Sequence, residues 1–150
     1  MHYYAKSFEQ LDIHTLYAIL KLRVDVFVVE QNCPYPELDG VDQQATHLYS
    51  QNDHGEILAY ARILPAGLTY ETAAIGRVIV TPKVRGGGIA RELMQKAIAI
   101  VRDDWQAPVI TIGAQVYLKD FYQSLGFVAI SDEYLEDGIA HIDMQLKFER

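Results

Sequence analysis

The sequence predicts an α/β fold, in which a mixed β-sheet carries helices on both of its faces. Strand-like segments dominate the first half of the chain, and the second half alternates strands with helices, an order typical of layered α/β domains. The composition agrees, because half of the 150 residues are hydrophobic and 22% are charged, as in globular proteins. A chain of this length is expected to form one domain.

The chain begins with a predicted strand, a helical region and a loop. Residues Tyr3–Phe8 are rich in aromatic side chains and are expected to form the first strand. Between Leu11 and Glu30, hydrophobic residues recur at helical spacing, which predicts one or two helices. Residues Asn32–Gln44 contain two prolines and a glycine, which interrupt regular structure, so we expect a loop there.

The middle of the chain is predicted to form three strands. His47–Gln51 and Glu56–Leu64 are strand-like segments, and the Asn52–Gly55 segment between them has the composition of a hairpin turn. Pro65–Thr72 is expected to form a loop. The segment Ala73–Val80 (AAIGRVIV) has the most strand-like composition in the chain.

The last third is predicted to alternate helices and strands. The apolar residues of Gly88–Asp103 recur on one side of a helix, and Val109–Gly113 is expected to be a strand that is apolar on both faces and therefore buried. Leu118–Leu125 is expected to form a short helix that Gly126 ends. Two strands are expected to complete the sheet, Phe127–Ile130 and His141–Phe148.

The composition excludes several classes of protein. The chain has 13 basic and 20 acidic residues and a formal net charge of −7, so we expect it to bind neither nucleic acid nor an anionic membrane. Cys33 is the single cysteine, which excludes an intrachain disulfide. No apolar run approaches the roughly 20 residues of a membrane helix, and residues 1–12 lack the profile of a signal peptide. We therefore expect a soluble, cytoplasmic protein.

The segment Ile75–Arg91 predicts an anion site. A strand leads there into three glycines and then into a helix, so successive N–H groups can point to one side, next to the partial positive charge of the helix N-terminus. Residues 77–91 contain four basic and no acidic residues, a charge of +4, whereas the remaining 9 basic and 20 acidic residues give −11. This combination favours a bound phosphate over a glycine turn that only caps the helix.

The motifs of the common nucleotide-binding folds do not fit this segment. A dinucleotide fingerprint would need Gly or Ala where Arg91 stands, and no P-loop pattern occurs. The pattern R-x-x-G-x-A at Arg85–Ala90, after V-x-V-x-P at Val78–Pro82, instead resembles the acetyl-CoA pyrophosphate loop of the GNAT N-acetyltransferases. The family's segment F-Y-x-x-L-G-F occurs at Phe121–Phe127, and Leu22–Asp42 with the His-Leu pair that follows resembles the ElaA-type branch.

The resemblance covers nearly the whole chain and implies one acyl-CoA N-acyltransferase domain over residues 1–150, with a central, mostly antiparallel and twisted sheet. The implied activity is transfer of the acetyl group of acetyl-CoA to a primary amine, by direct attack in a ternary complex. The implied cofactor-binding residues are Val78, Ile79, Val80, Arg85, Gly86, Gly87, Gly88, Ile89, Ala90 and Gln115. The family more often carries Asn at the position of Gln115.

The resemblance also implies catalytic residues. Tyr122 matches the family's general acid. A phenol of pKa about 10 suits that role, since it can protonate or hydrogen-bond a thiolate whose parent pKa is about 8.5. Some members place a glutamate base where Ala74 stands, whereas others use the histidine of G-x-x-H-I-x-M, here His141. A structural histidine fits His141 equally well, and His47 is a second candidate base. Arg77 matches a residue that binds the acceptor's anionic group, and a CoA contact or a salt bridge fits it too.

The sequence leaves the acceptor open. Acidic residues in Glu30–Asp42 and Asp132–Asp137 would border the acceptor cleft of the resembled fold and attract a cationic amine, such as a polyamine or a lysine side chain. Arg77 would instead suit an amine that carries a carboxylate. No metal is expected, because the histidines lack ligand spacing. Monomer and homodimer both remain open, as do a non-catalytic CoA-binding sensor and a general nucleotide-binding domain.

Overall fold

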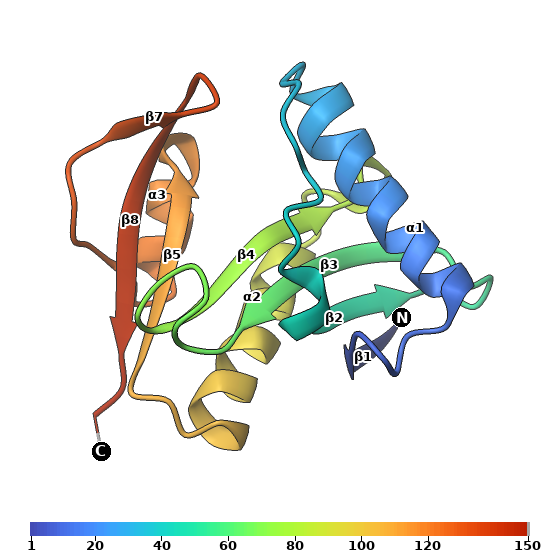
Figure 1. Ribbon diagram of the computed structural model, residues 1–150, viewed down its shortest axis with the longest axis horizontal. Coiled ribbons are helices and arrows are strands. Elements are labelled where there is room, and N and C mark those ends of the chain that lie inside the picture. Colours follow the sequence, from blue (N-terminus) through green and yellow to red (C-terminus); the bar gives the residue numbers. More distant parts are fainter. Residues whose placement is uncertain (150) are drawn as a thin grey trace.

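The computed structural model of the chain describes residues 1–149 and contains an eight-stranded sheet (Figure 1). The strands are β1 (His2–Ser7), β2 (Thr46–Gln51), β3 (Ile57–Leu64), β4 (Ala73–Val80), β5 (Val109–Gln115), β6 (Val128–Ala129), β7 (Tyr134–Glu136) and β8 (Ile139–Lys147). The helices are α1 (Ile13–Val24), α2 (Ile89–Ala99) and α3 (Lys119–Ser124). Turns of π-helix extend α1 over Asp25–Glu30 and α2 over Ile100–Asp104.

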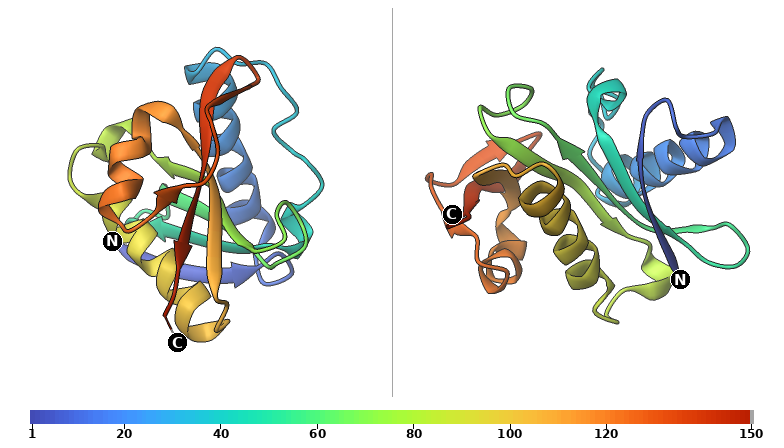
Figure 2. Two further views of the ribbon diagram at one scale, coloured as in Figure 1. Left: turned by 90° about the vertical axis from the view of Figure 1, so that its left-hand side faces the viewer. Right: turned by 90° about the horizontal axis from the view of Figure 1, so that it is seen from below.

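The sheet has the strand order β1-β2-β3-β4-β5-β8-β6, and β7 pairs with β8. Within residues 1–149 all neighbouring strands run antiparallel except β4 and β5, which run parallel. Helix α1 covers one face of the sheet, and α2 and α3 cover the other (Figure 2). The predicted fold class is thus confirmed. Over the same residues, no helix combines the length and the hydrophobicity that crossing a membrane requires.

Two hydrophobic clusters hold the helices on the sheet. On one face, Leu93, Met94 and Ala97 of α2 are fully buried in a large cluster with the inward side chains of β3, β4, β5 and β8. On the other face, Ile19 of α1 packs against Tyr60 of β3 and its neighbours. Because both clusters include side chains of β4, the centre of the sheet is fixed from both sides.

The predicted strands and helices are present, and their ends differ from the prediction by a few residues, except that β4 has the predicted bounds. Gly126 has a φ of +103° just after α3, as expected of a glycine that ends a helix. Strand β7 was not predicted. It turns into β8 through Asp137 and Gly138, which both have positive φ, 51° and 79°, as a two-residue hairpin turn requires.

Candidate active site

Strands β4 and β5 separate in the middle of the sheet. They pair only near their beginnings, Ala73 with Ile110 and Ala74 with Thr111. Farther along, β4 continues to pair with β3, and β5 continues to pair with β8, while the two strands run apart (Figure 1). The facing edges therefore present main-chain N–H and C=O groups that the sheet does not use. The predicted pantetheine segment Val78–Val80 belongs to this open edge.

A β-bulge lies where β4 leaves β5. Two residues of β4, Arg77 and Val78, lie opposite a single residue of β3, Ala61. Arg77 has a φ of +51°, a left-handed conformation that is uncommon for a residue with a side chain. Such a bulge bends the strand, so it contributes to the separation of the two strands at this point.

The predicted phosphate turn connects β4 with α2 and is exposed. Gly86 and Gly88 have φ values of +88° and +80°, and nothing lies within 4 Å of the place that a Cβ would take at either residue. Glycine at these two positions therefore allows the left-handed backbone conformation and leaves the surface of the turn open. No side chain caps the N-terminus of α2. The N–H groups of this turn are thus available to an anion.

The basic residues around the turn are mostly paired with acids from elsewhere in the chain. The Arg85 guanidinium donates to both carboxylate oxygens of Glu30, at 2.8 Å and 3.0 Å, and its Nε donates to the Val80 carbonyl at 2.8 Å. Lys83 forms an ion pair with Glu56 at 3.0 Å. The excess positive charge inferred from residues 77–91 is therefore largely neutralised by tertiary contacts.

The residues that follow α1 bridge the open ends of β4 and β5. Glu30 reaches the turn after β4 through its ion pair with Arg85. The next residue, Gln31, exchanges side-chain hydrogen bonds of 3.3 Å and 3.4 Å with Gln115 at the end of β5. Gln115, predicted to lie near the CoA arm, is therefore at the opening between the two strands.

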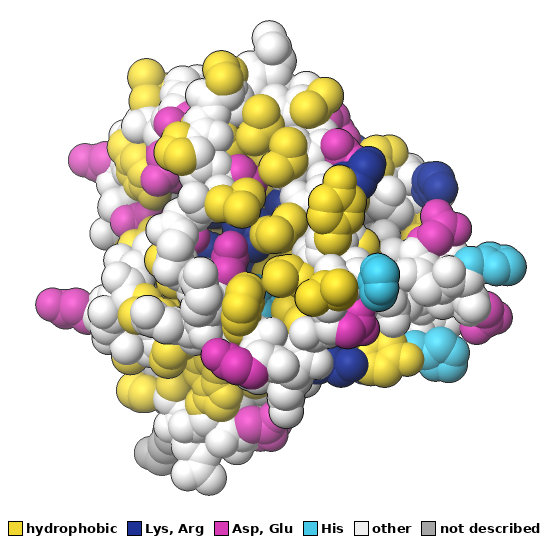
Figure 3. All heavy atoms as spheres, turned by 45° about the vertical axis from the view of Figure 1, so that its right-hand side comes forward, with side chains coloured by type: hydrophobic (Ala, Val, Ile, Leu, Met, Phe, Trp, Pro, Cys, Tyr) yellow, Lys and Arg dark blue, Asp and Glu magenta, His cyan; other side chains and the backbone are white. Residues whose placement is uncertain are grey.

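Arg77 belongs to a buried ion-pair network of three arginines and three acids: Arg23, Arg62, Arg77, Glu37, Asp39 and Asp42. Arg77 Nε lies 2.8 Å from the Glu37 carboxylate, and Arg23 contacts the same carboxylate at 2.7 Å. The six formal charges cancel. Figure 3 shows acidic and basic side chains beside one another in a hollow that hydrophobic side chains surround. Of the interpretations that the sequence allowed for Arg77, a salt bridge is the one that the structure contains.

The same network neutralises the acids of the loop before β2. Burial by itself would raise the pKa of Asp39, but hydrogen bonds from Arg62 and from the Val41 N–H lower it to about 2. The pKa of Asp42 is also lowered, because hydrogen bonds and charges of Arg23 and Arg62 outweigh the effect of burial. The part of the expected acidic rim that this loop would supply is therefore paired and not free to attract an amine.

His47 is buried, and both of its ring nitrogens are hydrogen-bonded within the protein. Its side chain is almost fully buried, its Nε2–H donates to the Asp42 carbonyl at 2.9 Å, and its Nδ1 accepts from the Tyr60 hydroxyl at 2.6 Å. Burial lowers the pKa of His47, so its ring is neutral near pH 7. With both nitrogens engaged, the second candidate base contributes to the core.

Tyr122 lies on α3 and is 7% exposed. Its ring packs edge-on against Phe127, with 6.0 Å between the ring centroids, and against Phe121 at 5.2 Å. Burial, with a smaller effect of Tyr117, raises the pKa of Tyr122 to about 12, so the phenol keeps its proton at neutral pH. Within residues 1–149 its hydroxyl has no hydrogen-bond partner, which leaves it available to a ligand.

His141 lies on β8, opposite Gln115 of β5, and is 8% exposed. Its Nδ1 is 2.7 Å from the Ile139 carbonyl oxygen, which can only accept a hydrogen bond, so Nδ1 carries a proton. The Nε2 atom is therefore the basic nitrogen of the neutral ring, 3.6 Å from a carboxylate oxygen of Glu136. The ring stacks on that of Tyr134 at 5.9 Å.

One face of β5 and β8 is polar. Thr111 and Gly113 of β5 pair with Gln145 and Asp143 of β8, and Gln115 pairs with His141. Because side chains alternate along a strand, these residues share one face while their neighbours enter the core under α2 and α3. The prediction that this strand is apolar on both faces was wrong, because Thr111 and the exposed Gly113 lie on the side away from that core.

Asp143 is the centre of a side-chain cluster on this face. Its Oδ1 accepts hydrogen bonds from the hydroxyls of Tyr70, at 3.0 Å, and Tyr134, at 2.6 Å. A Cβ at Gly113 would lie 3.0 Å from the Tyr70 hydroxyl and 3.3 Å from that of Tyr134, so a larger residue there would push against both hydroxyls of the cluster. We missed all three polar residues in the sequence. The two-residue spacing of His141 and Asp143 could have indicated Asp143, whereas Tyr70 comes from a distant loop.

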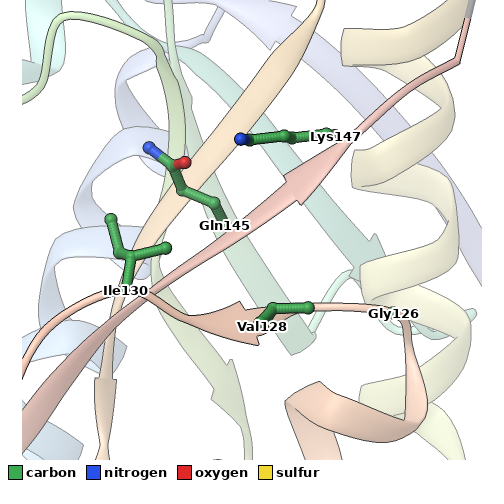
Figure 4. A pocket seen from close by; sticks show the side chains of 5 residues that line it. All are labelled: Gly126, Val128, Ile130, Gln145 and Lys147. Carbon is green, nitrogen blue, oxygen red and sulfur yellow. The ribbon is translucent and has the colours of Figure 1, made fainter.

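Two further hollows lie away from the open strands. One, of about 310 Å³, is lined by residues of β6, of β8 and of the segments on either side of β6: Gly126, Val128, Ile130, Gln145 and Lys147 (Figure 4). The other, of about 220 Å³, lies at the β7–β8 hairpin. Neither is lined by a residue predicted to bind CoA or to act in catalysis. Among residues 1–149, no three His, Cys, Asp or Glu side chains are placed to share a metal ion.

Known proteins resemble the chain along almost its whole length. The model of the acetyltransferase (GNAT) domain family matches residues 21–148. ElaA of Escherichia coli is 44% identical over 138 residues, which cover 90% of this chain and 89% of ElaA. A UPF0039 protein of Schizosaccharomyces pombe is 42% identical over 143 residues, which cover 95% of this chain and 94% of that protein.

Solved structures with similar sequences have the same fold as this chain. The crystal structure of E. coli ElaA has a TM-score of 0.91 at 38% identity and covers 98% of this chain and 100% of that one. An acyl-CoA N-acyltransferase from Pseudomonas aeruginosa has the same TM-score and identity and covers 97% of this chain and 99% of that one. The chain therefore belongs to the GNAT acetyltransferase family.

Proposed function

We propose that the protein transfers the acetyl group of acetyl-CoA to a primary amine, by direct attack of the amine on the thioester. The observation that carries the proposal is the open edge of β4, which lies in direct continuity with the exposed glycine turn before α2. An extended thioester arm fits the main-chain groups of the open edge, and a diphosphate at its end fits the N–H groups of the glycine turn. The acyl-CoA N-acyltransferase from P. aeruginosa, at 38% identity, supports an acyl-CoA as the donor.

The proposed CoA site uses mostly main-chain groups. The diphosphate would accept hydrogen bonds from the N–H groups of Arg85–Ala90, and the pantetheine amides would pair with Val78–Val80 as an additional strand would. Gln115 would lie beside the arm on the opposite strand. Glu30 occupies two of the N–H donors of Arg85, so a bound diphosphate would compete with this carboxylate for the guanidinium.

The proposed chemistry requires an amine without its extra proton. An alkylammonium group has a pKa near 10, so it must transfer one proton before its nitrogen can attack. We assign this role to His141, whose Nε2 has a free lone pair in the tautomer described above. The nitrogen then forms a bond to the thioester carbon, the carbon–sulfur bond breaks, and CoA leaves as the thiolate. The proton taken up by His141 returns to the solvent.

Tyr122 would stabilise the departing sulfur through a hydrogen bond. Its pKa of about 12 exceeds the thiol pKa of about 8.5 by roughly 3.5 units, so complete proton transfer to the sulfur would cost about 5 kcal/mol. A phenol that retains its proton still donates a strong hydrogen bond to a developing thiolate. The nitrogen loses its second proton to the solvent as the amide forms, and the thiolate takes up one proton from the solvent, so all protons are accounted for.

Incubation of the purified protein with radiolabelled acetyl-CoA and a panel of primary amines tests the proposal. We expect label in an amide product with at least one amine, and no product with Gly88→Asp, which places a negative charge at the phosphate turn. Tight CoA binding without transfer to any amine would indicate a sensor instead. Thermal protection by ATP or NAD, without protection by CoA, would indicate a nucleotide-binding domain.

A further inference from the structure

We propose that Asp143, held in place by Tyr70 and Tyr134, binds the ammonium group of the acceptor, which makes the acceptor a cationic alkylamine. This inference rests on the proposed acetyl transfer and names the group that selects its second substrate. It is carried by the charge balance of the cleft, by the free oxygen of Asp143 and by the position of Asp143 between the open strands and His141.

The charge balance sets Asp143 apart from the acids of the segment between α1 and β2. Glu30, Glu37, Asp39 and Asp42 each lie within ion-pair distance of an arginine. Asp143 is partly buried, yet among the residues that the structure describes its side chain accepts hydrogen bonds only from two neutral hydroxyls. A carboxylate that loses water without gaining a cation is destabilised, and an ammonium group from a ligand would supply the missing positive charge.

The hydrogen bonds of Asp143 leave one of its oxygens for that ligand. Tyr70 and Tyr134 both donate to Oδ1, so Oδ2 keeps its lone pairs. Burial, followed by the charge of Asp143, raises the pKa of Tyr70 to about 12, and burial, followed by the hydrogen bond to Asp143, raises the pKa of Tyr134. Both phenols therefore remain donors. The charged groups that act on them are Asp143 and Glu136, both acidic, so the surroundings favour a cation.

The position of Asp143 suits the reacting nitrogen. Its partner Gly113 lies two residues beyond Thr111, at which β5 makes its last pair with β4. Asp143 is therefore beside the point where the two strands begin to separate. His141 follows on the same face of β8, about 7 Å away along the strand. An ammonium group bound to Asp143 is thus placed between the open edge and the proposed base.

The proposed site also distinguishes substrate from product. The bound ammonium transfers one proton to His141 Nε2, and its nitrogen forms the new bond to the acetyl carbon as the carbon–sulfur bond breaks and CoA leaves as the thiolate. The nitrogen loses a second proton to the solvent as the amide forms. Asp143 stays ionised throughout. The product is a neutral amide, which lacks the positive charge that Asp143 binds, so the product is held less tightly than the substrate.

An NMR titration tests the site without requiring turnover. The protein, uniformly labelled with nitrogen-15 and saturated with CoA, is titrated with n-butylamine and, separately, with 1-butanol, which has the same length and no charge. We expect n-butylamine to shift the amide signals of Gly113, His141 and Asp143, and 1-butanol to leave them in place. The same titration is repeated with Asp143→Asn, whose Oδ1 can still accept both tyrosine hydrogen bonds, and with Asp104→Asn, an exposed acid at the far end of α2.

The Asp143→Asn spectrum should retain the dispersion of the folded protein but lose the response to n-butylamine, whereas Asp104→Asn should respond like the wild type. With the best amine acceptor, Asp143→Asn should raise the amine KM by about 10- to 100-fold, as expected for loss of a hydrogen bond to a charged group, and leave the acetyl-CoA KM unchanged. Equal responses to n-butylamine and 1-butanol, an unaltered response or amine KM in Asp143→Asn, or the absence of binding would overturn the inference. Failure of acetyl transfer with every amine, despite an Asp143-dependent response, would refute the proposed enzyme alone.

Discussion

Arg85 and Glu30 form a two-hydrogen-bond ion pair, 2.8 Å and 3.0 Å long, between the phosphate turn and the end of the helical region that follows α1. The pair is nearly half exposed, and the neighbouring Gln31 contacts Gln115 on the other side of the opening. One short segment is therefore attached to both strands between which CoA is proposed to bind. Binding of the diphosphate would compete directly with Glu30.

Replacing Glu30 by Gln should strengthen CoA binding. The substitution removes the charge that competes for Arg85, and an exposed ion pair of this kind contributes about 0.2–1 kcal/mol, which corresponds to a Kd lower by roughly 1.4-fold to fivefold. Isothermal titration calorimetry at low ionic strength measures the change. Glu56→Gln is the matched control, because it releases Lys83 from a similar exposed pair. Equal affinities for CoA in the two variants would contradict the competition.

A negative charge at the phosphate turn should prevent CoA binding by itself, apart from the backbone strain that any side chain at Gly88 introduces. Gly88 has a φ of +80°, so every side chain at this position introduces strain. Asn and Asp are similar in size and tolerate this conformation better than other residues, so they differ mainly in charge. We expect Gly88→Asp to abolish CoA binding and Gly88→Asn to weaken it only moderately, as measured by the thermal shift that CoA produces. Equal loss in both variants would point to the backbone.

Tyr122→Phe should lower kcat by on the order of 100-fold or less and keep the affinity for CoA. The ring contacts with Phe121 and Phe127 are retained, and the removed hydroxyl has no partner within residues 1–149, so we expect a stability close to that of the wild type. Steady-state kinetics with calorimetric measurement of CoA affinity separates the two effects. Since the pKa of Tyr122 is about 12, the wild-type profile of rate against pH should show no Tyr122 limb below about pH 10. An unchanged kcat would remove this hydroxyl from the mechanism.

Arg23→Met should destabilise the fold strongly. Arg23 is fully buried and contacts the carboxylates of both Glu37 and Asp42 at 2.7 Å, so its removal leaves buried negative charge without its partner. Breaking such an arrangement costs about 3–5 kcal/mol in the free energy of unfolding. Urea denaturation measures it. The control is Lys21→Met on the exposed side of α1, where an ion pair with Asp25 is lost and we expect less than about 1 kcal/mol.

The same network should make the protein sensitive to acid. The pKa of Asp39 falls from its ordinary value of 3.8 to about 2 on folding, and that of Asp42 is lowered as well. A carboxyl with a lowered pKa stabilises the fold above its unfolded pKa, and this contribution is lost as the pH falls towards the folded value. We therefore expect the free energy of unfolding to decline from about pH 4 towards pH 2. Asp39→Asn should be less stable than the wild type at neutral pH, and the difference should become smaller over this interval.

Features that depend on local sequence could be predicted well. The strand β4, the glycine turn and α2 follow from short-range patterns of apolar residues and glycines, and β4 has the predicted bounds. Tyr122 and His141 were assigned catalytic roles from motifs of a few residues, and these roles stay predictions. Strand β7 was missed, although Asp137 and Gly138 are typical of a two-residue hairpin turn.

The sequence by itself determined the order of strands and helices, the family resemblance and the glycine turn between β4 and α2, because backbone preferences and periodicity act over a few neighbouring residues. Only the tertiary structure decided which charges remain free. Arg85 and Glu30 are 55 residues apart, Arg77 and Glu37 are 40 apart, and Tyr70 and Asp143 are 73 apart. Whether an arginine or an acid is neutralised depends on which distant group the folded chain brings within hydrogen-bonding distance, and local spacing carries no information about that distance.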